Sequence, residues 1–202
     1  MTVRYPIPAA EHSFEQEIKH SRFIATVVPA PTVAEARAQI AAIAARYPDA
    51  THNCWAFHVG VGPHAEIGAS DDGEPGGTAG RPMLLVLQGS GLGDVAAVVT
   101  RYYGGVKLGS GGLVRAYGGT LQKALNELPT SEQVIRRAGM LAIDYALYEQ
   151  SRRLLAQFDA VIEAEDFAAS VTLLVALPQD QWEACADAVR ELSNGAAALL
   201  DA

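Results

Sequence analysis

The 202-residue chain carries 15 Lys and Arg against 23 Asp and Glu, a formal net charge of −8, and half of its residues are apolar. That balance excludes an extensively disordered chain, and the length is enough for two domains that each bury a core of their own. The apolar runs fall far short of the ~20 residues that cross a bilayer, and the first residues lack the layout of a secretory signal, so we expect a cytoplasmic protein without membrane contacts.

The first predicted element is a strand at residues 21–28, which is rich in β-branched side chains. Thr32 and Glu35 have the spacing of a capping box, which predicts a helix that continues to about Tyr47. The next strand is predicted at residues 52–59, where the side chains divide into two alternating faces. One face carries two histidines and a cysteine, and because alternate strand residues diverge, packing is favoured over metal binding for these three side chains.

Residues 60–80 follow as a loop rich in Gly and Asp, and Thr78 is the predicted cap of a helix that runs through Leu87. A third strand is predicted at residues 94–103; it has a valine-rich, buried-looking centre and leads directly into two glycines. Beyond a glycine loop, apolar residues with helical spacing begin at Leu113 and end near the next proline. Strand, glycine loop and helix therefore follow one another.

The composition shifts after residue 131, and the remaining chain predicts the order βαββαβ, which is the ferredoxin-like split unit. Its elements are a strand at 138–147, a helix at 149–158, strands at 161–165 and 168–177, a helix at 180–192 and a strand at 196–200. We therefore predict an α+β protein with one domain at residues 1–133 and a second at residues 134–202.

Charged residues and cysteines are spread unevenly over these domains. Residues 1–135 carry 10 Lys and Arg against 12 Asp and Glu, and residues 136–202 carry 5 against 11. A broad basic surface for nucleic acid is therefore not predicted, and anion binding has to depend on a local cluster. Cys54 and Cys185 fall in different predicted domains, which favours two free thiols.

Seventeen of the 19 glycines lie between Gly60 and Gly119, and they accompany two segments that concentrate charged and aromatic residues. The first segment, residues 70–80, reads Ser-Asp-Asp-Gly-Glu-Pro-Gly-Gly-Thr-Ala-Gly. The second, residues 101–117, reads Arg-Tyr-Tyr-Gly-Gly-Val-Lys-Leu-Gly-Ser-Gly-Gly-Leu-Val-Arg-Ala-Tyr. Because glycine is useful where the backbone needs positive φ or close approach, any functional site is expected here.

The Gly-Ser-Gly-Gly sequence at residues 109–112 opens a predicted helix directly after a strand. Free N–H groups and the positive end of the helix dipole would converge there on an anion. Arg101, Lys107 and Arg115 flank the turn and could bind phosphate or carboxylate. The spacing is neither that of a P-loop nor that of a dinucleotide-binding fingerprint. A purely structural role, in which the glycines only allow a tight turn, remains the alternative.

Asp71, Asp72 and Glu74 form an acidic group on the first segment. Three carboxylates could hold Mg²⁺, could form a solvated turn, or could pair with Arg101 and Arg115. Pairing is favoured, because so polar a loop gives no sign of the apolar pocket that a catalytic carboxyl with a raised pKa requires. No metal and no cofactor are predicted.

Tyrosines stand beside the arginines, which is the local pattern of single-strand base stacking or peptide recognition. Because neighbouring strand residues face opposite ways, Tyr102 and Tyr103 cannot both face a cleft, and one of them is expected in the core. Neither Ser70 nor Ser110 lies in a Gly-x-Ser-x-Gly elbow, so a hydrolase has no support. The candidate ligand-binding cleft comprises Asp71, Asp72, Glu74, Thr78, Arg101, Tyr103, Lys107, Gly109, Ser110, Gly111, Gly112, Arg115 and Tyr117.

These segments closely resemble the YigZ/IMPACT family, whose N-terminal domain carries Ser-Asp-Asp-Gly-Glu-Pro with Gly-Thr-Ala-Gly, then Arg-Tyr-Tyr-Gly-Gly, Leu-Gly-x-Gly-Gly-Leu and Ala-Tyr. Here the motifs stand at residues 70–75, 77–80, 101–105, 108–113 and 116–117, and residues 19–24 fit as well. The resemblance implies that the first domain is like domain 2 of ribosomal protein S5. It also implies that the second is like the last domain of elongation factor G.

Eukaryotic relatives act as translation regulators through protein partners, so the resemblance implies a partner such as the ribosome, RNA or a translation-associated protein. It transfers no catalytic residues. A binding protein is therefore favoured over an enzyme, although a phosphate-handling enzyme akin to the GHMP kinases and a pure protein-interaction module with an acidic second domain remain open. Against the kinase, the chain lacks that family's Gly-Leu-Gly-Ser-Ser loop.

Overall fold

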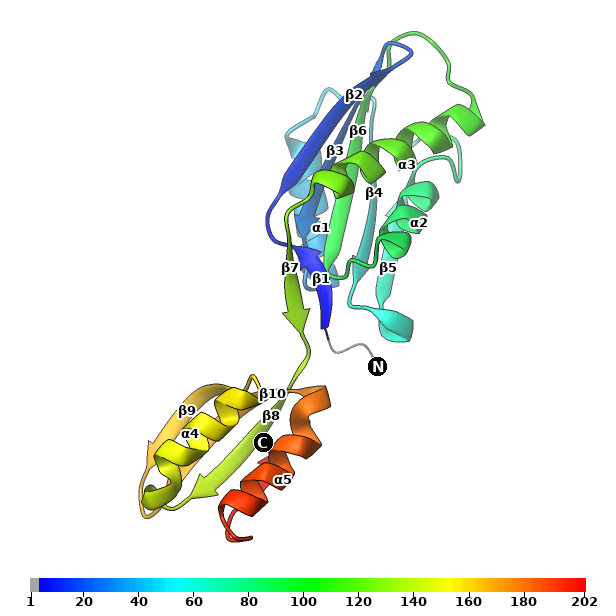
Figure 1. The fold of residues 1–202 in the computed structure, drawn as a ribbon. Helices are drawn as coiled ribbons and strands as arrows, with labels where there is room; N and C mark the ends of the chain where they lie inside the picture. Colours follow the sequence, from blue (N-terminus) through cyan, green and yellow to red (C-terminus); the bar gives the residue numbers. More distant parts are fainter. Residues whose placement is uncertain (1–3) are drawn as a thin grey trace. The chain divides into compact units, whose positions relative to one another are not determined.

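The computed structural model describes residues 4–202, so the first three residues of the segment assessed for a secretory signal lie outside the described part. The chain forms two compact units, Met1–Gln133 and Val134–Ala202, which are described one at a time (Figure 1). None of the helices in the described part combines the length and the apolar character that a bilayer crossing demands.

The first unit is built on a five-stranded sheet in which all neighbouring strands are antiparallel. In spatial order the strands are β2 (His12–Ile18), β3 (Ser21–Pro29), β6 (Val95–Tyr102), β4 (His52–Val59) and β5 (Glu66–Ser70). Two further strands, β1 (Arg4–Pro8) and β7 (Thr130–Val134), form a small separate sheet. The short helix η1 (Gly62–His64) precedes β5.

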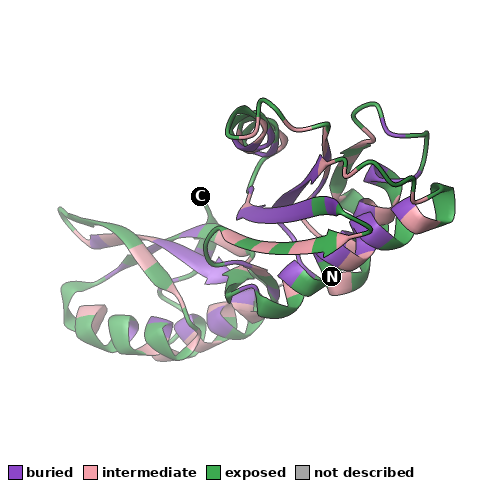
Figure 2. Ribbon diagram, turned by 90° about the horizontal axis from the view of Figure 1, so that it is seen from above, coloured by how far each residue is buried: buried purple, intermediate pink, exposed green. Residues whose placement is uncertain are grey.

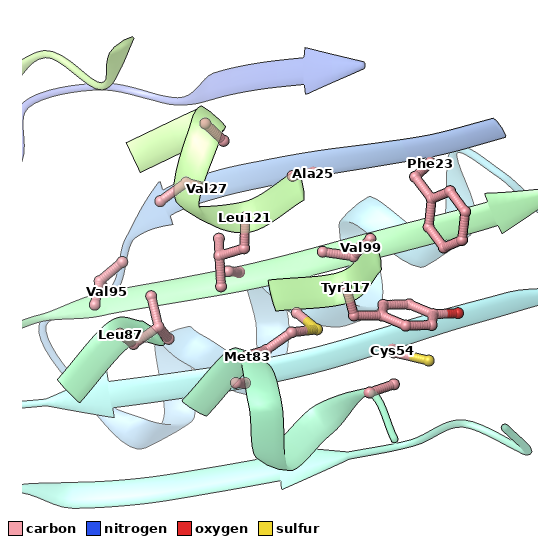
Figure 3. Packing of buried hydrophobic residues seen from close by; sticks show 14 of the residues in the cluster. Phe23, Ala25, Val27, Cys54, Met83, Leu87, Val95, Val99, Tyr117 and Leu121 are labelled. Atoms are coloured by element: carbon pink, nitrogen blue, oxygen red, sulfur yellow. The ribbon is translucent and has the colours of Figure 1, made fainter. Parts of the chain in front are cut away.

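Helices cover both faces of this sheet: α1 (Val33–Ala45) lies on one face, and α2 (Gly80–Ser90) and α3 (Ser110–Glu127) lie on the other (Figure 1). Val98 packs into the core under α1, whereas its neighbour Val99 packs under α2 and α3 (Figure 3). Central strands that bury both faces read as continuous apolar runs. Buried residues accordingly line the strands and the inner sides of the helices (Figure 2).

The second unit has the βαββαβ order that the sequence predicts, and its antiparallel sheet has the strand order β11-β8-β10-β9. The elements are β8 (Arg136–Ile143), η2 (Tyr145–Leu147), α4 (Tyr148–Gln157), β9 (Val161–Phe167), β10 (Val171–Pro178), η3 (Gln179–Gln181), α5 (Trp182–Leu192) and β11 (Leu199–Asp201). Leu141, Leu155 and Leu173 belong to a core within this unit. The predicted α+β class is confirmed.

Two local expectations for the first unit were wrong. Strand β5 lies inside the stretch predicted as loop, and it contains Gly68, where any Cβ would overlap the ring of Phe57. The predicted cap of α2 is also not made, because the hydroxyl of Thr78 donates to the carbonyl of Pro75 at 2.5 Å. The predicted cap of α1 at Thr32 is confirmed, since the N–H of Glu35 donates to Thr32 Oγ1 at 3.1 Å, and the Glu35 carboxylate reaches back to accept the Thr32 hydroxyl at 3.2 Å.

Candidate functional site

The two glycine-rich segments meet around a hollow of about 390 Å³, which we call the first hollow. It lies where the chain leaves β6 and enters α3. It is lined by Glu74, Pro75, Arg101, Tyr103, Lys107, Leu108, Gly109, Ser110 and Leu113. Six of the predicted cleft residues are among these nine, and the remaining three supply an apolar wall.

A buried ion pair forms the floor of this site. Arg101 Nη1 donates to Glu74 Oε1 at 2.6 Å, and the two side chains are 6% and 4% exposed. The hydroxyl of Tyr117 donates to the same carboxylate oxygen at 2.7 Å. Burial, together with the neighbouring Cys54 and Glu74, raises the pKa of Tyr117, so its hydroxyl stays protonated and remains a donor.

The guanidinium of Arg101 is held on several sides, but one of its three nitrogens, Nε, has no hydrogen-bond partner among residues 4–202. Its Nη2 donates to Ser21 Oγ at 3.3 Å. The central carbon of the guanidinium, Cζ, lies 5.4 Å from the ring centroid of Phe23 and 5.3 Å from the ring centroid of Tyr103. The unpartnered Nε–H is buried. A buried donor left unsatisfied costs about 1–3 kcal/mol, so a ligand oxygen or water that reached it would stabilise the site.

Asp71 acts as a remote cap for α2. Its carboxylate accepts the backbone N–H groups of Gly77, Ala79 and Gly80 at 2.7, 2.9 and 2.8 Å. Desolvation alone would raise the pKa of Asp71, but the three N–H groups outweigh it and hold the pKa below its ordinary value. Asp71 therefore orders the loop and the start of the helix at once.

Asp72 fastens the same loop to β4. Its Oδ2 accepts the backbone N–H of Asn53 at 2.6 Å, and its carbonyl oxygen lies 2.7 Å from Nδ1 of His52. The backbone turns there through positive φ at Asp72 and Gly73. The sequence left three roles open for the acidic group: Mg²⁺ binding, a solvated turn, or pairing with arginines. Glu74 pairs with Arg101, whereas Asp71 and Asp72 accept hydrogen bonds from backbone N–H groups. In the part of the chain that the structure describes, no three His, Cys, Asp or Glu side chains gather to hold a metal ion.

The start of α3 presents donors to the first hollow. Gly109 precedes the helix at φ 74°, and the first backbone hydrogen bond runs from the N–H of Leu113 to the carbonyl of Gly109. The N–H groups of Ser110, Gly111 and Gly112 thus have no acceptor within the helix. Gly109 and Ser110 line the first hollow beside Lys107, which makes no ion pair among the described residues.

A smaller neighbouring hollow of about 220 Å³, the second hollow, lies on the other side of Leu108. Its lining is Ile18, Lys19, Leu108, Gly112, Arg115 and Ala116. The expected pairing of Arg115 with the acidic segment is wrong, because Arg115 faces this hollow instead and forms no ion pair within residues 4–202. Its position one turn into α3 directs it to this side of Leu108.

The tyrosines and Cys54 differ in part from expectation. The hydroxyl of Tyr102 donates to Asp49 at 2.9 Å and Tyr103 is 44% exposed, so neither is core. Strand β6 ends at Tyr102, so burial on alternating faces does not extend to the next residue. The core tyrosine is Tyr117, whose ring meets Phe23 edge-on beside Cys54 (Figure 3). Burial raises the pKa of Cys54 to about 12, which leaves an unreactive thiol.

Ser21 is the contributor that the sequence reasoning missed. It is fully buried, and its hydroxyl oxygen accepts hydrogen bonds from Arg101 and from the backbone N–H of Gly104. A Cβ on Gly104 would overlap the carbonyl of His20, so the loop after β6 rests directly on the β2–β3 turn. A serine at the start of a strand whose other residues are mostly apolar was the available signal.

Comparisons with known proteins agree with this architecture. The chain matches the Impact N-terminal domain over residues 19–125 and a domain of unknown function, DUF1949, over residues 141–196. It is 42% identical to the IMPACT family member YigZ of Escherichia coli, over 96% of both chains. It is 41% identical to an IMPACT family member of Haemophilus influenzae, over 95% of this chain and 93% of that one.

A third relative, the IMPACT family member YvyE of Bacillus subtilis, is 37% identical over 93% of this chain and 85% of its own length. A crystal structure described as that of a hypothetical protein superposes with a TM-score of 0.73 at 40% identity, and covers 100% of this chain and 98% of that chain. Sequence motifs, domain matches and near full-length relatives agree, and the chain belongs to the IMPACT family.

Proposed function

We propose that this protein is a cytoplasmic binding protein linked to the regulation of translation, and that its first hollow holds an anionic group of RNA or of a ribosomal partner. The observation that carries the proposal is the buried, unpartnered Nε–H of Arg101 in the lining of a hollow that also receives the start of an 18-residue helix. Both features are hydrogen-bond donors that an anion would satisfy.

The charge balance of the hollow supports a modest, salt-sensitive interaction. Glu74 compensates the charge of Arg101, so Lys107 is the lining cation that no described carboxylate neutralises. The helix start adds roughly half of a positive charge. One cation with oriented N–H groups suits a single phosphate or carboxylate better than a broad polyanionic surface.

The link to translation rests on the resemblance of the chain to eukaryotic translation regulators with the same N-terminal motifs. The family match extends over the residues that build the first hollow. The proposal uses the presence of that hollow in this chain. The partner is expected to present a phosphate or a carboxylate to it.

Binding of ribosomes and of a single-stranded RNA, measured across salt concentrations, tests the proposal. We expect association that weakens as salt rises, and about a fivefold loss for Lys107→Gln at 0.1 M salt, since each single-strand phosphate contact scales with salt to about the power 0.7. Arg37→Gln, which removes an exposed cation of α1, is the control and should bind like the wild type. Absence of association with either probe, in wild type and variants alike, would refute the proposal.

A further inference from the structure

The two hollows adjoin at a shared side chain. Leu108 belongs to the lining of both, and the first turn of α3 contributes Gly109 and Ser110 to the first hollow and Gly112 to the second. Consecutive residues at one helix start therefore serve two neighbouring depressions. This arrangement suggests that one ligand occupies both hollows. That inference rests on the proposed function.

Cations without ion-pair partners surround this helix start. Lys107 lines the first hollow, and Lys19 and Arg115 line the second, and none of the three forms an ion pair with any residue in the described range 4–202. Glu17 is on the same hairpin as Lys19, but its Oε1 lies 3.6 Å from Nδ1 of His20 and forms no ion pair with Lys19. In a chain with a net charge of −8, three uncompensated cations on one helix start form a local positive patch.

The backbone holds Lys19 at this position. Lys19 and His20 form the two-residue turn between β2 and β3 with φ of 49° and 63°, a conformation that non-glycine residues rarely adopt. The loop after β6 packs on this turn, because Gly104 lies against the carbonyl of His20 and its N–H donates to Ser21 Oγ at 3.2 Å. The turn that carries Lys19 is thus fixed against the segment that carries Lys107.

An aromatic ring lies beside the positive patch. Tyr103 lines the first hollow, has the guanidinium of Arg101 5.3 Å from its ring centroid, and is still 44% exposed. Bases of single strands stack on such rings, at about 1–3 kcal/mol per base, without sequence preference. A duplex would not offer an unstacked base, and the chain lacks the broad basic surface that duplex binding uses.

We propose that the two hollows form one continuous site for a nucleic-acid single strand. One phosphate lies in the first hollow beside Lys107 and the N–H groups of the α3 start, and the next lies in the second hollow between Lys19 and Arg115. A base adjoining the first phosphate stacks on Tyr103. A ligand that fills the whole site therefore presents at least two phosphates and one unpaired base.

The test is the affinity of the full chain for 5′-phosphorylated oligouridylates of one and four nucleotides. Lys19→Gln/Arg115→Gln removes both cations of the second hollow and leaves an uncharged polar side chain at each position. At 0.1 M salt we expect it to weaken the tetranucleotide about fivefold and to lower the slope of log affinity against log salt by about 0.7, since the second hollow holds one phosphate and each single-strand phosphate contributes about 0.7. The mononucleotide should bind within about twofold of wild type.

Arg37→Gln/Arg153→Gln, which removes two exposed cations of α1 and α4, is the matched control and should leave both affinities unchanged. Tyr103→Leu should weaken the oligouridylates but not an inorganic polyphosphate with the same number of phosphates. Circular dichroism of each variant verifies that the fold is retained.

The outcomes separate the two proposals. If the tetranucleotide binds, loses affinity with Lys107→Gln and is indifferent to Lys19→Gln/Arg115→Gln, the continuous site is refuted while the anion site in the first hollow stands. If polyphosphate binds as well as the oligonucleotide and Tyr103→Leu changes neither, the ligand is a polyanion without bases and the single-strand proposal is refuted. If no probe binds at any salt concentration, both proposals fall together.

Discussion

Glu74 joins a loop, a strand and a helix through a single carboxylate. Its Oε1 accepts from Arg101 on β6 and from Tyr117 on α3, and Glu74 itself lies on the loop between β5 and α2. Both ions of the pair are nearly fully buried, so each depends on the other for compensation. Loss of one partner leaves an uncompensated buried charge, which costs far more than the pair itself contributes.

We therefore expect Glu74→Gln to lower the free energy of unfolding of the first unit by about 3–5 kcal/mol. Urea unfolding followed by Trp55 fluorescence in a Trp182→Phe background reports on this unit alone, because the two tryptophans lie in different units. Glu15→Gln is the control, since the pair of Glu15 with Arg22 is half-exposed and should contribute at most about 1 kcal/mol. Equal effects of the two substitutions would contradict the role of burial.

The start of α2 is organised by a residue nine positions upstream. Asp71 supplies the acceptor for the N–H groups of Ala79 and Gly80, while the adjacent candidate, Thr78, bonds to Pro75. Capping rules are local, so the sequence pattern pointed to Thr78. The carboxylate instead reaches the helix because the loop folds back on itself, which no local spacing reveals.

The lowered pKa of Asp71 predicts a pH dependence of the stability of the first unit. A carboxyl whose folded-state pKa is depressed stabilises the protein above its unfolded pKa, about 3.9, and loses that contribution as pH falls through the folded-state pKa. At pH 7, Asp71→Asn should lower the free energy of unfolding by about 1–2 kcal/mol. This difference from the wild type should shrink below about pH 4.

Urea unfolding at a series of pH values measures that difference. Glu66→Gln, which removes an exposed carboxylate of β5, is the control and should differ from the wild type by a constant amount. A difference between Asp71→Asn and the wild type that stays constant down to the lowest pH would show that Asp71 is not an ionised cap.

Periodicity predicted some elements well, but β1, β2 and β7 were not predicted, although β2 also alternates between two faces. The alternation at residues 52–59 gave β4 with both faces assigned correctly, since Cys54 and Phe57 enter opposite cores. Strand β5 was missed because it is five residues long and contains Gly68, which usually weakens a strand. The need for glycine at this position comes from the ring of Phe57 on the neighbouring strand β4, which would overlap any Cβ. Local sequence does not show that contact.

The candidate site, too, has features that the sequence predicts and features that it does not. The meeting of the two segments around Arg101 could be predicted, because a strand, a glycine loop and a helix start converge locally on one place. The capping role of Asp71 could not be predicted, since it depends on how the loop folds back onto the start of α2. The second hollow could not be predicted either, since it depends on how the β2–β3 turn packs against α3.

At the scale of the whole molecule, each unit has cores made of its own residues, and no described core residue is shared between them. A chain of this kind is not expected to unfold in one two-state transition. We predict that Leu173→Ala, in the core of the second unit, lowers the stability of that unit by about 2–5 kcal/mol. Hydrogen exchange resolved by residue should show faster opening at residues 136–201 only.

Leu121→Ala, in the core under α3, is the reciprocal variant and should accelerate exchange only in the first unit. Acceleration throughout the chain by either substitution would mean that the units unfold together. The pair of variants thus measures the thermodynamic coupling between the two units.

The contact of Gly104 with the carbonyl of His20 affects how a ligand could enter the first hollow. Main chain rests on main chain there, so the loop between Tyr103 and Lys107, which both line the first hollow, has little room to move toward the β2–β3 turn. A ligand too large for the first hollow would then displace the loop on which Pro75 lines the same hollow, which we call the Pro75 rim. That rim is anchored by Asp71, so an oversized occupant would strip the leading turn of α2 of its acceptor and loosen a helix that it never touches.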